Sequence, residues 1–121
     1  MFRIDESKIF YEIDRRKPKA VGFAAPDGIL PILQEAALKV YERYGIDVFL
    51  LADPCYGSCD IADKDVERLG LDIVFHVGHS TASDWLSSRT VMVPAFDDAS
   101  FERVLEKSLL FLKGYRRIGL C

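Results

Sequence analysis

The stretch KAVGFAAPDGILPILQEAALKVYERYGIDVFLL, residues 19–51, contains the clearest signals of the fold. It begins with a short apolar run over residues 19–24, which is typical of a buried strand. Residues 28–44 then place apolar side chains on one helical face and charged side chains on the other, and Gly45 is a residue type that ends helices. A second apolar run, residues 46–51, predicts a strand covered on both faces. Strand, helix and strand in this order predict parallel strands joined by a right-handed crossover.

The rest of the chain continues the alternation of helices and strands. Residues 5–16 predict a first helix, with acidic side chains early and basic side chains late. Further elements are predicted as a helix over residues 60–69, strands over 72–77 and 90–93, a last amphipathic helix over 101–112 capped by Asp98 or Ser100, and the start of a strand over 117–120. The sequence therefore predicts one domain over residues 1–121, a three-layer α/β/α fold with a mainly parallel sheet of about four strands and flanking helices.

The composition indicates an ordinary soluble protein. Of the 121 residues, 50% are hydrophobic and 29% are charged, and the formal net charge is -3. No basic patch points to a nucleic-acid partner, and no apolar run reaches the roughly 18 residues that a membrane span needs. We therefore expect a cytoplasmic protein with neither kind of partner. In that compartment the three cysteines, Cys55, Cys59 and Cys121, are expected to be reduced thiols or metal ligands rather than disulfides.

Three polar loops that contain glycine follow three of the predicted strands. They cover residues 25–28, 53–60 and 78–81. In parallel α/β sheets, ligands bind beyond the carboxyl ends of the strands, where loops converge and helix N-termini present amide donors. We therefore expect the three loops to line one rim of the sheet.

The second and third loops carry the most specific motifs of the chain. Residues 53–60 read Asp-Pro-Cys-Tyr-Gly-Ser-Cys-Asp, and residues 76–80 read His-Val-Gly-His-Ser. Together with Pro26-Asp27-Gly28, these motifs resemble the paired signatures of the diphthamide biosynthesis family. The resemblance runs from the opening helix to residues 116–119, which look like the first strand of that family's second domain. It implies that the chain is the first of three related α/β domains, with the second and third absent.

The resemblance implies a non-standard radical enzyme of archaeal type that uses S-adenosylmethionine. Each domain of the family's enzyme contributes one cysteine to a [4Fe-4S] cluster, and Cys59 matches the ligand from the first domain. The activity implied is transfer of a 3-amino-3-carboxypropyl group to a histidine of elongation factor two, the first step of diphthamide synthesis, by an enzyme that is a homodimer in archaea. One cysteine cannot hold a cluster, so the fragment alone is expected to lack the cluster and to be inactive.

Residues around Cys59 and His79 are expected to contact the cofactor. Iron binds thiolates, and a thiol at a helix N-terminus loses its proton more easily. Gly57 would let the backbone approach a ligand where a Cβ would clash, and Tyr56 would shield the cluster from water. His79 is placed to hydrogen-bond a substrate or cofactor carboxylate. The predicted cofactor-binding residues are Asp27, Tyr56, Gly57, Gly78, His79 and Ser80, with Asp27, like Asp53, also suited to a turn or cap.

Other residues near these motifs have a simpler interpretation. Cys55 is expected to pack beside the cluster without binding it, since the family takes one ligand from this domain. His76 lies inside a predicted strand and is expected to be packed in the core. Cys121 is interpreted as a strand residue, and Trp85 and Leu86 as side chains that cover the edge of the core or meet another domain.

Two other function classes fit parts of the sequence. Cys55, Cys59, His76 and His79 could form a structural zinc site, because zinc binds these side chains. Against this, sixteen residues separate Cys59 from His76 and only two separate the histidines, which departs from zinc-finger spacing, and a strand would point His76 away from the loop. A non-catalytic nucleotide-binding or oligomerisation domain could share the fold. Metal analysis separates the zinc site from the iron-sulfur enzyme, since the enzyme requires iron with sulfide and the structural site requires zinc.

Overall fold

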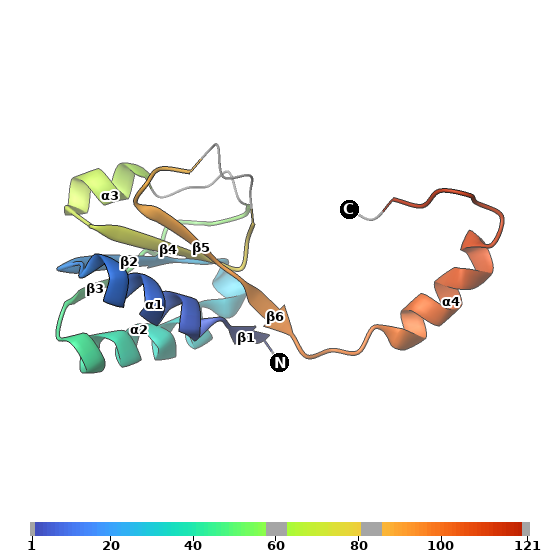
Figure 1. Ribbon diagram of the computed structural model, residues 1–121, viewed down its shortest axis with the longest axis horizontal. Coiled ribbons are helices and arrows are strands. Elements are labelled where there is room, and N and C mark those ends of the chain that lie inside the picture. Colours follow the sequence, from blue (N-terminus) through green and yellow to red (C-terminus); the bar gives the residue numbers. More distant parts are fainter. Residues whose placement is uncertain (1, 58–62, 81–85, 120–121) are drawn as a thin grey trace.

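A parallel sheet of four strands forms the centre of the protein (Figure 1). The computed structural model describes residues 2–57, 63–80 and 86–119. The strand order is β3-β2-β4-β5, with bounds Asp47–Leu50 for β3, Ala20–Ala24 for β2, Ile73–Val77 for β4 and Thr90–Val93 for β5. Since all three pairings are parallel, the predicted fold class is confirmed.

Helices cover both faces of the sheet, which gives the predicted three layers. Helices α1 (Glu6–Arg16) and α2 (Leu30–Tyr44), the latter preceded by the short helix η1 (Asp27–Ile29), lie on one face. Helix α3 (Asp63–Leu69) lies on the other. The larger core forms between the sheet and α1 and α2, where the rings of Phe23 and Phe75 stack with centroids 5.2 Å apart.

The ends of the helices follow local sequence signals. Asp5 caps α1 because its Oδ1 accepts a hydrogen bond from the backbone N–H of Lys8 at 3.3 Å. Gly45 ends α2 with φ of 62°, as the sequence predicts. The start predicted for the third helix at residue 60 lies outside the described residues, and α3 is described from Asp63.

The amino end of the sheet is held by a carboxylate. Asp72 precedes β4, and its Oδ2 accepts backbone N–H hydrogen bonds from Lys19 at 2.7 Å and Ala20 at 3.1 Å. These two hydrogen bonds, made to the ionised form, hold the pKa of Asp72 below its usual value. The carboxylate therefore connects the entries of the two central strands.

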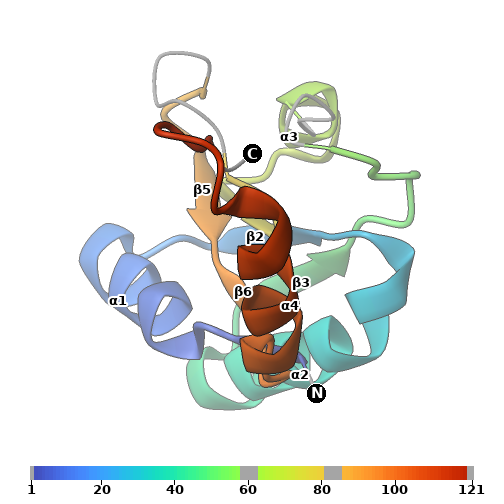
Figure 2. The same ribbon diagram turned by 90° about the vertical axis from the view of Figure 1, so that its right-hand side faces the viewer.

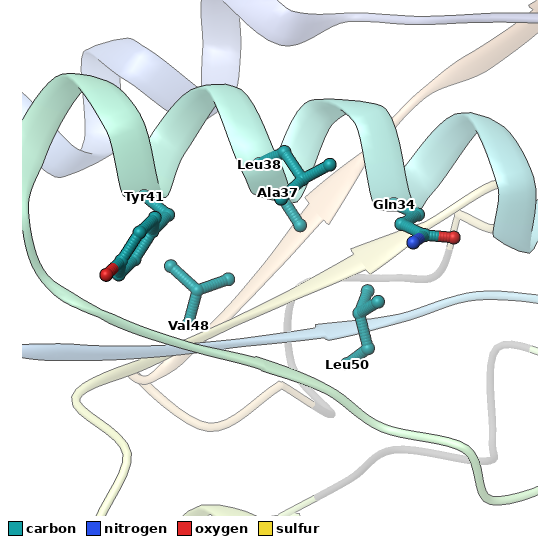
Figure 3. Close-up of a pocket in the computed structure, with 6 residues that line it drawn as sticks. All are labelled: Gln34, Ala37, Leu38, Tyr41, Val48 and Leu50. Atoms are coloured by element: carbon teal, nitrogen blue, oxygen red, sulfur yellow. The ribbon is translucent and has the colours of Figure 1, made fainter.

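Strand β3 differs from the prediction that both its faces are covered. It is the edge strand of the sheet, and Phe49 and Leu50 are 37% and 43% exposed. One face packs against α2, where an apolar groove of about 230 Å³ stays open (Figure 3). The groove is lined by Gln34, Ala37, Leu38, Tyr41, Val48 and Leu50. The apolar run thus predicted the strand correctly, but it did not predict how many faces of the strand are covered.

A two-stranded antiparallel ribbon was not predicted. Strand β1 (Phe2–Ile4) pairs with β6 (Ala95–Asp97), which directly follows β5 along the chain. The ribbon is reinforced by an ion pair between Arg3 and Asp98 at 2.7 Å. Each strand has only three residues, too few for an alternating pattern to stand out.

The C-terminal segment stands away from the sheet (Figure 1), and in the view turned by 90° helix α4 is seen in front of the rest of the domain (Figure 2). Helix α4 (Glu102–Leu112) forms as predicted, but no residue of this fully described helix is buried. Phe101 is its N-cap, not Asp98 or Ser100. Ser100 instead accepts a hydrogen bond from the Glu102 N–H at 3.4 Å. The predicted apolar face therefore exists without a partner element in the described part of the chain.

The strand predicted over residues 117–120 does not form in residues 117–119, and residue 120 is not described. A strand needs a neighbouring edge with which to pair, and this segment lies beyond α4, away from the sheet. Within the described ranges, no helix combines the length and apolar character needed to cross a membrane.

Candidate functional site

The described parts of the three glycine-bearing loops meet at the carboxyl ends of the parallel strands. Gly78, after β4, lies against the first loop, because a Cβ built there would be 3.6 Å from Cδ of Pro26. Cys55 of the second loop has its Sγ 3.7 Å from Nδ1 of His79 in the third. The predicted common rim is thus present in these residues.

The centre of the rim is a cluster of three side chains, Cys55, His76 and His79, which we call the Cys-His-His cluster. The Cys55 Sγ lies 3.5 Å from Nε2 of His76 and 3.7 Å from Nδ1 of His79. The two ring nitrogens lie 3.0 Å apart. Cys55 and His76 are buried and His79 is half-buried, so the cluster is covered on the protein side and reachable at His79.

The pleat of β4 explains why His76 joins this cluster. Phe75 packs in the larger core, whereas Val74 packs in a smaller core on the α3 side, so alternate residues face opposite sides. His76 shares the side of Val74. Leu51, which begins the segment leading to Cys55, packs in that same smaller core. The expectation that a strand would point His76 away from the loop is therefore wrong, because the loop crosses the face on which His76 lies.

Gly78 turns the chain back toward the cluster. Its φ is 91°, a conformation that residues with a Cβ rarely adopt, and its N–H donates to the carbonyl of Val93 at 3.0 Å. A Cβ at this position would lie 2.9 Å from Cδ1 of Ile29. The turn and this close approach let His79 reach His76, three residues earlier in the chain.

A pocket of about 250 Å³ adjoins the cluster at His79. Its lining comprises Lys8, Gly78, His79, Ser80, Met92, Pro94 and Ala95. Lys8 projects from α1 and supplies a cationic group, which suits a carboxylate or another anion. Sequence reasoning placed Gly78, His79 and Ser80 together, as observed, but missed Lys8, because nothing local in the first helix indicates which loop it faces.

Asp27 lies in a different pocket. It lines a space of about 390 Å³ whose other residues are Leu30, Pro31, Gln34, Leu50, Leu51 and Ala52. Tyr56 and Gly57 of the predicted cofactor-binding set line neither pocket, and the other four residues are divided between the two. Only the one that includes His79 also borders the Cys-His-His cluster.

Two further predicted site residues, Tyr56 and Gly57, lie in the loop after β3. Cys59 lies outside the described residues, as do Trp85 and Cys121, so their roles stay predictions. Tyr56 is 89% exposed in this chain, and its shielding of a cluster also stays a prediction. A Cβ built on Gly57 meets no atom within 4 Å, so no described neighbour requires glycine there.

Three of the four residues considered for a zinc site come together in the described structure. Cys55 and both histidines have their ligand atoms within 4.8 Å of one another. The interpretation of Cys55 and His76 as simple packing residues therefore omits their mutual contact. The sequence offered two signals for this cluster, the spacing His-x-x-His and the alternation of side chains along a strand. These signals do not show which face of the sheet the loop with Cys55 crosses, so they did not predict the contact.

Comparison with known proteins gives a consistent result. The sequence model described as "Putative diphthamide synthesis protein" matches residues 25–121. The chain is 33% identical, over 90% of its length, to the 2-(3-amino-3-carboxypropyl)histidine synthase of Pyrococcus horikoshii, and 24% identical, over 98%, to that of Methanocaldococcus jannaschii. It covers 32% and 38% of these relatives, about a third of their length.

Solved structures extend the likeness to the fold. The crystal structure of Dph2 from Pyrococcus horikoshii with a 4Fe-4S cluster matches with a TM-score of 0.82 and 33% identity. The match covers 94% of this chain and 34% of that one. A second crystal structure of the same Dph2 matches with the same values.

Proposed function

Because the chain belongs to the diphthamide synthesis family, we propose that it forms the first-domain part of a 2-(3-amino-3-carboxypropyl)histidine synthase. In this proposal the thiolate of Cys59 is one ligand of a [4Fe-4S] cluster. The observation that carries the proposal is the position of Cys55 at the rim, four residues before Cys59 in the family motif. A thiol-bearing loop at the carboxyl ends of the strands fits an iron-sulfur group, since iron in such clusters binds thiolates.

The chemistry proposed for the complete enzyme is transfer of a 3-amino-3-carboxypropyl group. A reduced cluster, when bound, would supply the electron that breaks a carbon–sulfur bond of S-adenosylmethionine, which would leave methylthioadenosine and a 3-amino-3-carboxypropyl radical. The radical would add to a ring carbon of a histidine of elongation factor two, and the adduct would lose one proton and one electron to restore the imidazole. The pocket beside His79 is the proposed place for the amino-acid part of S-adenosylmethionine. There the Lys8 ammonium group pairs with its carboxylate, and Ser80 offers a hydroxyl donor.

The proposal takes one cluster ligand from these 121 residues. The chain spans about a third of its relatives' length, so the other ligands would come from regions that correspond to the rest of those proteins. We therefore expect the 121-residue chain alone to hold no stable cluster and to be inactive. Homodimer formation and a cytoplasmic location belong to this same proposal.

The test is anaerobic reconstitution with iron and sulfide. One sample is the chain alone, and the other is a chimera in which the chain replaces the matching third of the Pyrococcus horikoshii synthase. We expect visible iron-sulfur absorption and stoichiometric acid-labile sulfide only in the chimera. Cys59→Ser should remove most of both signals, whereas Cys55→Ser, the matched control, should retain them. A chimera that keeps its iron and sulfide after Cys59→Ser would contradict the proposal.

The group transfer needs a separate measurement. The reconstituted chimera is incubated with elongation factor two, S-adenosylmethionine and a reductant, and the mass of the elongation factor is recorded. A mass increase matching one 3-amino-3-carboxypropyl group on histidine is expected. Its absence from a chimera with a complete cluster would refute the proposed substrate pair.

A further inference from the structure

The Cys-His-His cluster has the dimensions of one face of a tetrahedral zinc site. With Zn–S bonds of about 2.3 Å and Zn–N bonds of about 2.0 Å, the ligand atoms of a tetrahedron lie about 3.5 Å apart for sulfur and nitrogen and about 3.3 Å apart for two nitrogens. The corresponding distances here are 3.5 and 3.7 Å from Cys55 Sγ to the two rings, and 3.0 Å between the rings of His76 and His79. A zinc ion would therefore require shifts of only a few tenths of an ångström.

Either a proton or a cation can hold the two facing ring nitrogens of His76 and His79 together. A neutral imidazole nitrogen either donates or accepts, so one of the two facing nitrogens must carry a proton and the other must not. A divalent metal at the centre instead receives one lone pair from each of the three atoms, once the thiol has released its proton.

We propose that Cys55, His76 and His79 bind one Zn²⁺ ion, with the fourth coordination position filled by an exchangeable ligand such as water. Three protein ligands and one open position are typical of zinc sites that bind small ligands. His79 also lines the 250 Å³ rim pocket, which gives such a ligand a route to the metal. The inference goes beyond the proposed function, because it uses Cys55 and does not use Cys59.

The metal would connect parts of the rim that are distant in sequence. Cys55 lies in the segment after β3, and His76 belongs to β4, 21 residues further along the chain. Zinc would therefore fasten the loop that carries the family motif to the central strand. Because the ion would bind the folded state and not the unfolded chain to the same degree, it should raise the unfolding temperature in a concentration-dependent manner.

The test uses the 121-residue chain without iron or sulfide. The reduced protein is titrated with Co²⁺, which reports thiolate coordination by a near-ultraviolet charge-transfer band and tetrahedral geometry by intense visible bands, and Zn²⁺ is then used to displace it. We expect one equivalent of each metal and a rise in unfolding temperature with zinc. A folded, reduced chain that shows neither band nor thermal shift would overturn the proposal.

Variants separate this site from the proposed iron-sulfur ligand. Cys55→Ala should abolish the charge-transfer band, and His79→Asn, at a half-buried position, should weaken zinc binding by about tenfold or more. Cys59→Ser is the matched control and should bind cobalt as the unmodified chain does. Far-ultraviolet circular dichroism confirms folding of each variant. Binding that survives Cys55→Ala, or that is lost in Cys59→Ser, would refute the three-ligand site without bearing on the cluster.

Discussion

Replacing Gly78 by alanine should destabilise the protein strongly. A residue with a Cβ at the positive φ of 91° costs about 1–2 kcal/mol. The added Cβ would also lie 2.9 Å from Cδ1 of Ile29, a side chain only 7% exposed within the larger core, and overpacking of this kind costs about 1–3 kcal/mol. Because relaxation of Ile29 relieves part of the clash, we expect a total loss of about 2–4 kcal/mol in the free energy of unfolding.

Urea denaturation followed by circular dichroism measures this loss. With a slope of about 2 kcal/mol per molar urea, the midpoint of Gly78→Ala should fall by roughly 1–2 M. Gly28→Ala is the matched control, since Gly28 does not have positive φ and a Cβ there meets no atom within 4 Å. That variant should be unchanged or more stable by about 0.4–1 kcal/mol. Equal midpoints for the two variants would refute the role assigned to Gly78.

Three further predictions test the core, the C-terminal helix and the amino end of the sheet. Leu33→Ala removes a side chain with no exposed surface and should lower the urea-derived stability by about 2–5 kcal/mol, and a loss below 1 kcal/mol would contradict its place in the core. Leu109→Ala, at a side chain 57% exposed on α4, should change it by less than about 0.5 kcal/mol, so a larger loss would show that α4 packs on the sheet. Asp72→Asn should lose about 1 kcal/mol at neutral pH, a value reduced by solvent screening. Because the folded pKa of Asp72 is lowered, this stabilisation is complete above the ordinary pKa of about 4 and disappears as the pH falls below it, so urea midpoints of the two proteins should converge in acid.

The alternation of strands and helices was predictable because its signals are local. Gly45 ends α2 in the left-handed conformation, and the amphipathic pattern before it marks the buried face of that helix. The exposure of β3 and α4 was not predictable in this way. Whether an apolar strand or helix face is covered depends on elements distant in sequence, and periodicity contains no information about them.

The candidate site shows the same division. The convergence of three loops follows from the rule that parallel strands end at one edge, so the rim was predictable. The contact between Cys55 and His76 was not, because it requires knowledge of the sheet face over which the loop passes. Lys8 joins the rim pocket from α1, the first helix, for a similar reason.

The strand order has a consequence for how the chain acquires its structure. Val21 in β2 pairs with Val48 on one side, 27 residues away, and with Ile73 on the other, 52 residues away. During synthesis β2, α2 and the edge strand β3 can associate early, while the edge of β2 that will pair with β4 is still unpaired. Such distant pairings raise the contact order and slow folding. Until β4 emerges, the nascent chain therefore exposes an unpaired strand edge that can pair with other chains and aggregate. Chaperones protect edges of this kind.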